Sequence, residues 1–85
     1  MKHATAATLD QLEPILVKLR TIPGLKEKSR GCFYRKSKSF LHFHEDLAGF
    51  FADIDDGTEF KRMPVNSESE KMELIEVAMM ILKVE

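Results

Sequence analysis

The segment from Phe40 to Ile54 restricts the fold of this chain more than any other part of the sequence. It reads FLHFHEDLAGFFADI, in which runs of alternating apolar and polar residues flank the turn-forming residues 45–49. Alternation with a period of two is typical of a strand that buries one face, and Asp and Gly favour turns. The segment therefore predicts an antiparallel hairpin with strands over residues 40–45 and 50–55.

Further elements are predicted on both sides of this hairpin. We expect a strand over residues 31–35 with a turn at 36–39, and a short strand over 59–63 after the Asp-Gly-Thr turn at 56–58. Apolar residues at helical spacing predict two helices, one that ends at Pro23-Gly24 and one that opens at the Ser67/Glu70 capping box. The second helix has a main apolar stripe of Met72, Ile75, Met79 and Leu82, which is widened by Leu74, Val77, Ala78 and Ile81 and leaves Met80 and Val84 to one side. The order is α-β-β-β-β-α. This order predicts an α+β, two-layer sandwich: an antiparallel meander sheet with both helices on one face.

The bulk properties of the chain limit its class. Its 85 residues are enough for a single domain spanning 1–85, of which we expect residues 1–7 to be flexible. Apolar residues make up 44% and charged residues 32%, and the net charge is −1, so no global attraction to nucleic acid or to acidic lipid is predicted. The sequence contains no long apolar run and one cysteine, Cys32. We therefore expect a cytoplasmic protein with no membrane association and no internal disulfide.

Strand alternation assigns side chains to the two faces of the sheet. We place a two-residue turn at Ser37-Lys38, which puts Phe33 opposite His42, and we expect Asp53 opposite His42 on the other side. The apolar positions of the strands then lie under the helices: Cys32, Tyr34, Leu41, Phe43, Phe50, Ala52 and Ile54. With a three-residue turn at 56–58, Phe60 joins this core face and Lys61 lies opposite Asp53. The other face remains open and contains three phenylalanines, which predict an interaction surface. Its expected members are Phe33, Arg35, Phe40, His42, His44, Phe51 and Asp53.

The pair His42 and His44 is a candidate metal site. Histidines two positions apart on a strand point the same way, so both imidazoles can reach one ion. Asp53 across the ladder is either a third ligand, through a carboxylate oxygen, or a residue that orients His42. The alternative is an ordinary solvent-facing ladder in which these side chains make cross-strand pairs. Both interpretations are compatible with the sequence, and no cofactor other than zinc is suggested.

The segment Lys26–Lys38 is a candidate anion-binding or nucleic-acid-binding segment. It combines basic side chains with Phe33 and Tyr34, a combination that holds single-stranded nucleic acid through phosphate contacts and stacking. The candidate anion ligands are Arg30, Arg35, Lys36 and Lys38. The alternative is a solvated hairpin whose lysines protect a sheet edge from unwanted pairing.

The sequence favours a non-catalytic role, because no nucleophile is predicted to face the histidines and no phosphate-binding loop is present. Our first expectation is a small interaction protein that self-associates as a homodimer, or binds another protein, through the open face of the sheet. The alternative is a metal- or ligand-binding protein, including a hydrolytic one, that uses His42, His44 and Asp53. A second alternative is binding of single-stranded nucleic acid or anions.

Overall fold

The protein is represented by a computed structural model that describes residues 2–83. The elements, in chain order, are β1 (Lys2–His3), α1 (Ala6–Arg20), β2 (Lys26–Ser29), β3 (Cys32–Arg35), β4 (Lys38–Asp46), β5 (Gly49–Asp55), β6 (Phe60–Pro64) and α2 (Glu68–Lys83). They confirm the predicted α+β fold, a helix followed by antiparallel meander strands and a second helix. Two short strands were not predicted: β2, which extends the meander beside β3, and β1, which pairs with β4.

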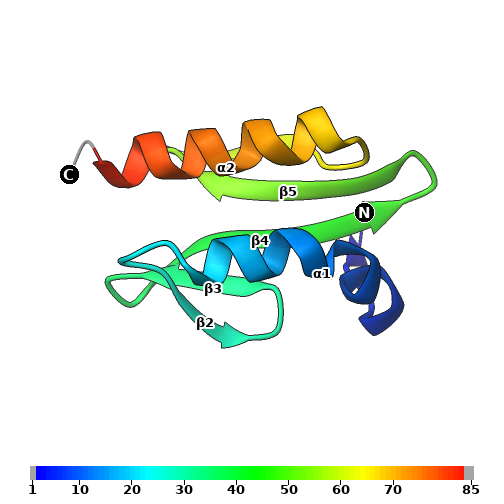
Figure 1. The fold of residues 1–85 in the computed structure, drawn as a ribbon, viewed down its shortest axis with the longest axis horizontal. Coiled ribbons are helices and arrows are strands. Elements are labelled where there is room, and N and C mark those ends of the chain that lie inside the picture. Colours follow the sequence, from blue (N-terminus) through cyan, green and yellow to red (C-terminus); the bar gives the residue numbers. More distant parts are fainter. Residues whose placement is uncertain (1, 84–85) are drawn as a thin grey trace.

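The strand order in the sheet is β2-β3-β4-β5-β6, and β1 adds to β4 (Figure 1). Strand β4 is nine residues long. Its first part pairs with β3, whose last pairing reaches Leu41, and its end pairs with β1 at His44 and Glu45. Two different segments therefore occupy the same edge of β4, one after the other.

The hydrophobic core lies between the sheet and the helices. Helix α1 has Thr5 as its N-cap, whose side chain accepts a hydrogen bond from the Thr8 N–H, and helix α2 opens with the predicted Ser67/Glu70 capping box. The fully or nearly buried apolar side chains are Leu12, Ile15, Leu16, Leu19, Phe33, Phe40, Leu41, Phe43, Ala52, Ile54, Met63, Val65, Leu74 and Ala78. Within residues 2–83, neither helix has the length and apolar character that a membrane crossing requires.

The ladder between β4 and β5 has the register that the sequence predicts. Six consecutive pairs run without a bulge from Leu41↔Ile54 to Asp46↔Gly49. His42 lies opposite Asp53, and Phe43 lies opposite Ala52. Alternation then buries Leu41 and Phe43 in the core and places the histidines on the other face.

The predicted register of β3 against β4 is wrong by one residue. The turn is formed by Lys36 and Ser37, not by Ser37-Lys38, so that Arg35 pairs with Lys38. A β-bulge at Phe40 then sets Phe33 opposite Leu41 instead of His42. Phe33 and Phe40 were expected on the open face, but they are 1% and 2% exposed and belong to the core. Cys32 and Tyr34, which were expected in the core, are only half-buried.

The free energy of burial explains this shift. Lys36 and Ser37 have φ angles of 51° and 69°, in the left-handed region that costs a non-glycine residue roughly 1–2 kcal/mol. Burying a phenylalanine side chain gains about 1.5–3 kcal/mol, and the observed register buries two of them. The gain from Phe33 and Phe40 exceeds the strain in the turn.

The turn between β5 and β6 also differs from the prediction. It contains four residues instead of three, because Asp56 Oδ1 accepts hydrogen bonds from the N–H groups of Thr58 and Glu59 at 2.9 and 3.0 Å. The extra residue places Arg62, not Lys61, opposite Asp53. It also moves Phe60 out of the core to the open face, where it is 46% exposed.

Helix α2 presents a different side to the core than its sequence stripe suggests. The predicted stripe contained Met72 and Met79, but these side chains are exposed, as is Met80. The buried positions are Leu74 and Ala78. Val84, which the sequence placed off the stripe, lies outside the described residues.

We predict that Phe33→Ala lowers the free energy of unfolding by about 3–5 kcal/mol, because it empties a filled core position. The matched control, Phe60→Ala, removes a half-exposed ring and should cost about 1 kcal/mol or less. Urea unfolding measures both values. Equal losses for the two variants would contradict the observed register of β3.

Candidate metal centre

His42, His44 and Asp53 come together on the face of the sheet opposite the core. His42 and His44 lie two positions apart on β4, and Asp53 projects from β5 directly opposite His42. One donor atom from each of these residues lies within 4.8 Å of the other two. Two ligands of one zinc ion are about 3.4 Å apart, since each lies about 2.1 Å from the metal in tetrahedral geometry. A small rotation of the side chains would therefore bring the three donors onto one ion.

The two nitrogens of His44 are the clearest sign that this cluster is incomplete. Both are shielded from solvent, and neither makes a hydrogen bond within residues 2–83. The Nε2 atom lies 3.2 Å from Asp53 Oδ2, but the contact does not have hydrogen-bond geometry. A buried polar atom without a partner costs about 1–3 kcal/mol and calls for a reason, such as an ion that it binds.

Asp53 is held as a carboxylate by Arg62. The guanidinium group donates from Nε to Oδ1 and from Nη2 to Oδ2, each at 2.8 Å. These hydrogen bonds lower the pKa of Asp53 below its usual value, and they outweigh the effect of burial, which raises it. A carboxylate accepts about four hydrogen bonds or ligand contacts, so Oδ2 keeps a lone pair for a metal ion while it is bonded to Arg62.

His42 is kept neutral by its surroundings. Burial lowers the pKa of His42 below its usual value near 6.5, and the neighbouring His44 lowers it further, whereas the charge of Asp53 raises it. The ring of Phe60 packs edge-on against the His42 ring, with 5.2 Å between the ring centroids. A neutral imidazole has the free lone pair that metal binding requires.

His3 belongs to the same cluster, although sequence reasoning set it aside as part of a flexible start. Strand β1 pairs with β4 so that His3 lies opposite His44. The two rings stack with 4.8 Å between their centroids, and the His3 ring lies 6.2 Å from that of His42. A strand of two residues is too short to show a periodic pattern. The sequence therefore indicates His3 only as a third histidine in the chain.

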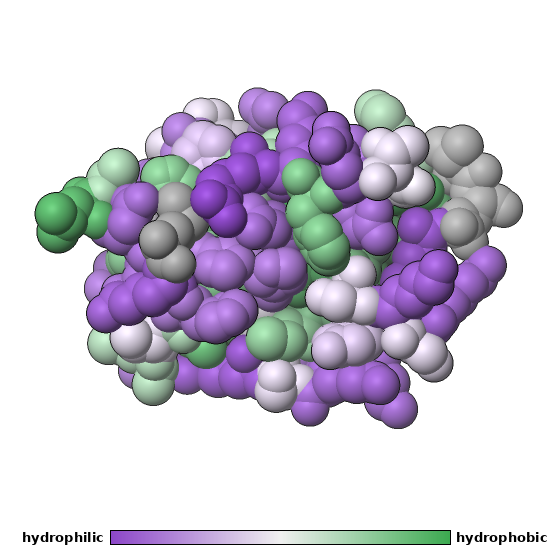
Figure 2. Space-filling view, turned by 180° about the vertical axis from the view of Figure 1, so that it is seen from behind, coloured by the Kyte–Doolittle hydropathy of each residue, from purple (hydrophilic) through white to green (hydrophobic). Residues whose placement is uncertain are grey.

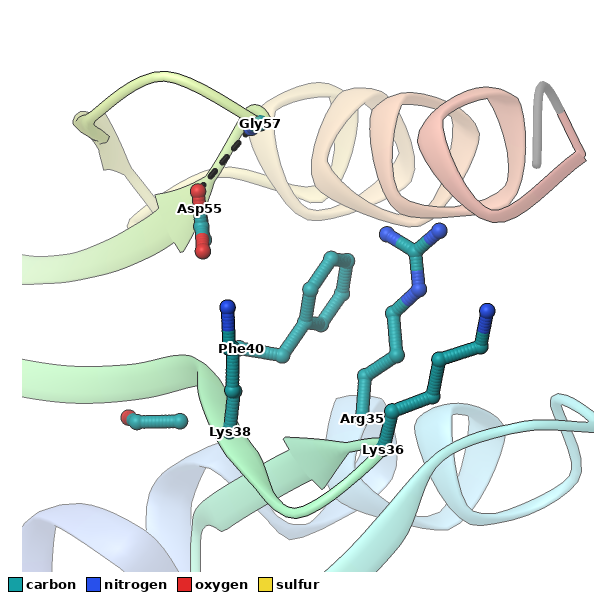
Figure 3. Close-up of a pocket in the computed structure, with 7 residues that line it drawn as sticks. Arg35, Lys36, Lys38, Phe40, Asp55 and Gly57 are labelled. Carbon is teal, nitrogen blue, oxygen red and sulfur yellow. Dashed lines mark hydrogen bonds between the residues drawn. The ribbon is translucent and has the colours of Figure 1, made fainter.

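The basic residues of the candidate anion segment do not all gather in one place. Arg30 is paired with Asp10 and Glu13 of α1, at 2.7 and 2.9 Å, and lies away from the other three. Arg35, Lys36 and Lys38 line a cavity of about 250 Å³ together with Ser39, Phe40, Asp55 and Gly57. Figure 3 shows these three side chains extending from the β3–β4 hairpin, with Asp55 beyond the end of Lys38 and the Phe40 ring between Lys38 and Arg35. Anion or nucleic-acid binding by this segment remains a prediction.

The open face of the sheet keeps only part of its predicted interaction surface. Phe33 and Phe40 lie in the core instead, and Phe51 is half-buried. Phe60, which was expected in the core, lies on the open face. Arg35 is half-buried, with its guanidinium carbon 5.7 Å from the centroid of the Phe40 ring. In Figure 2, seen from behind the view of Figure 1, the molecular surface is mostly hydrophilic and its hydrophobic side chains form separate groups. A continuous apolar patch formed by three phenylalanines is therefore not present there.

The fold and the cluster define an α+β protein with a histidine–aspartate group on the uncovered face of its sheet. Comparison of the chain with protein-family models, with curated proteins and with solved structures finds no significant match.

We predict that the NMR titration of the His42 ring in metal-free protein has its midpoint below 6.5. Asp53→Asn should lower this midpoint further, because the Asp53 charge is the interaction that raises the pKa of His42. Since the folded pKa lies below the unfolded value, the contribution of neutral His42 to stability is complete above about pH 6.5 and is lost as the pH falls. A midpoint above 6.5, or a rise in the Asn variant, would refute this description of the site.

Proposed function

We propose that this protein binds a transition-metal cation of the zinc class through His42, His44 and Asp53. The observation that supports the proposal most directly is the pair of buried His44 nitrogens without hydrogen bonds, next to two further donors within 4.8 Å. A histidine whose two nitrogens are both buried without hydrogen bonds lowers the stability of the fold. A ladder with a purely structural role gains nothing from such a residue. Binding of a metal ion would satisfy one of the two nitrogens.

The donor set favours a zinc-class ion over calcium or magnesium. Two imidazoles and one carboxylate suit zinc, copper, nickel or cobalt, whereas calcium and magnesium require mainly oxygen ligands. The charges around the site agree with this choice. The negative charge of Asp53 is balanced by the positive charge of Arg62, so net charge attracts a cation only weakly. Coordination by the imidazole nitrogens must then provide most of the affinity, and this favours a zinc-class ion.

We propose that the site binds a metal ion, and we do not propose a hydrolytic reaction at it. A hydrolytic metal centre needs a cleft for its substrate beside the ion. The cavity at the hairpin turn and the open groove beside α2, of about 610 Å³, are both lined by other residues.

The test is zinc titration by calorimetry on protein freed of its purification tag and of bound metal. The wild type should bind one zinc ion, and His42→Ala and His44→Ala should each weaken binding at least tenfold, since even the loss of a residue that only supports a ligand costs that much. Asp55→Asn is the matched control, because Asp55 is an acid of the same strand and face outside the cluster. Its affinity should equal that of the wild type. Absence of zinc binding, or equal binding by all variants, would refute the proposal.

A second candidate function is self-association, with helix α2 as the contact surface instead of the sheet. The exposed side chains Met79 and Met80 line the groove beside α2 together with three further apolar residues and two charged ones: Ile22, Pro23, Leu82, Glu76 and Lys83. Methionine-rich apolar surfaces of this kind adapt their shape to protein partners. The groove therefore supports the expected dimer better than the mostly hydrophilic face in Figure 2 does.

We predict that light scattering after size exclusion detects a dimer of the wild type at high micromolar concentration, and that Met80→Glu dissociates it, because a charge in an apolar contact is costly. Met72→Glu is the control, since Met72 is equally exposed on the same helix but does not line the groove. A monomeric wild type would exclude this second function.

A further inference from the structure

We infer that His3 is a fourth ligand of the proposed metal site, so that metal binding fastens the N-terminal strand β1 to the sheet. This inference rests on the proposed function and adds to it a ligand from a distant part of the sequence. With His3, the cluster contains three imidazoles and one carboxylate, a complete set for a tetrahedral ion.

Backbone pairing places His3 beside the cluster, in addition to the contacts of its ring. His3 and His44 are direct partners in an antiparallel ladder, and the side chains of such partners project from the same face about 4.5–5.5 Å apart. The Ala4 N–H, next in the chain, donates to the Phe43 carbonyl at 3.1 Å. This hydrogen bond continues the pairing with β4 one residue past His3 and keeps the His3 backbone beside the cluster.

Glu45 provides a second anchor for the same segment. Its Oε1 atom accepts hydrogen bonds from the Thr5 N–H at 2.8 Å and from the Thr8 hydroxyl at 2.6 Å. These two bonds are the largest causes of the lowered pKa of Glu45. The carboxylate connects β4 to the start of α1, and through this connection it keeps β1 in register with His44.

The His3 ring is close enough to reach an ion shared with His44 and His42. Its centroid lies 4.8 Å from that of His44, with 28° between the ring planes, and 6.2 Å from that of His42. The His3 side chain is exposed, and rotation toward the cluster is not blocked by core packing. A nitrogen of His3 would then close the side of the site that faces solvent.

The pairing of β1 is weak without such a ligand. A strand of two residues contributes few ladder bonds, and the ion pair of Lys2 with Glu45, at 3.9 Å and exposed, adds little. A metal ion held by His3 and β4 would therefore convert a marginal contact into a stable one. The occupied and the empty protein should differ in how firmly their first residues are attached.

The experiment uses cobalt(II), whose visible spectrum reports its coordination, and zinc on tag-free full-length protein. The wild type should give the intense absorption of four-coordinate cobalt, and His3→Ala should weaken binding of both metals about tenfold to a hundredfold. Lys2→Ala is the matched control, because it changes the neighbouring residue of β1, on the opposite face, and should bind like the wild type.

A direct ligand is distinguished from a merely supporting residue by His3→Cys in a Cys32→Ser background. A thiolate bound to cobalt adds a near-ultraviolet charge-transfer band, which a cysteine outside the coordination sphere cannot produce. Hydrogen exchange of the Ala4 amide should also slow when zinc is added to the wild type, and not in His3→Ala.

The outcomes separate the two proposals. A wild type that takes up neither metal refutes the proposed function and this inference together. A wild type that binds metal, with unchanged affinity in His3→Ala and no charge-transfer band in the cysteine variant, refutes the role of His3 and leaves the three-residue site standing.

Discussion

The continuous ladder between β4 and β5 is the constraint on which the rest of this structure depends. Its six pairs contain no bulge, so alternation is unbroken along both strands. The same register that buries Leu41 and Ile54 in the core must place His42 and Asp53 together on the opposite face. A shift of the register by one residue would expose the apolar side chains to solvent. The free energy of their burial therefore stabilises the register that forms the candidate site.

The sequence predicted this ladder with its register, whereas it predicted the strands β3 and β6 beside it but not their registers. The central hairpin alternates between apolar and polar residues over 41–44 and 52–55, and this pattern determines its register. By contrast, β3 and β6 are short, and their registers depend on the length of one turn each. At Lys36-Ser37 the burial of two phenylalanines outweighs backbone strain, and at Asp56 a side chain that bonds two N–H groups lengthens the turn. Tertiary burial and side-chain hydrogen bonds of this kind cannot be read from local preference.

The residues of the candidate site were also predicted or missed according to how strong the local sequence pattern is. His42, His44 and Asp53 were predicted because all three lie on the ladder with the strong pattern. Arg62 was missed because the β5–β6 turn is one residue longer than expected, and its place was assigned to Lys61. His3 was missed because its position depends on hydrogen bonds that Glu45 makes with Thr5 and Thr8, about forty residues away in the sequence.

The ion pair of Arg62 with Asp53 supports the proposal that the cluster binds a metal ion. If the cluster served only to bind Arg62 to Asp53, the bidentate ion pair would be sufficient. Apolar or small polar neighbours would then cover this pair at a lower cost in free energy than two imidazoles do. Instead, a neutral His42 and a His44 without hydrogen bonds point toward the second oxygen of a carboxylate already fixed in position. Arg62 holds Asp53 ionised and oriented, as residues behind a metal ligand commonly do. One oriented carboxylate with two adjoining imidazoles is the arrangement that the proposed zinc-class site requires, and an ordinary surface ladder does not need it.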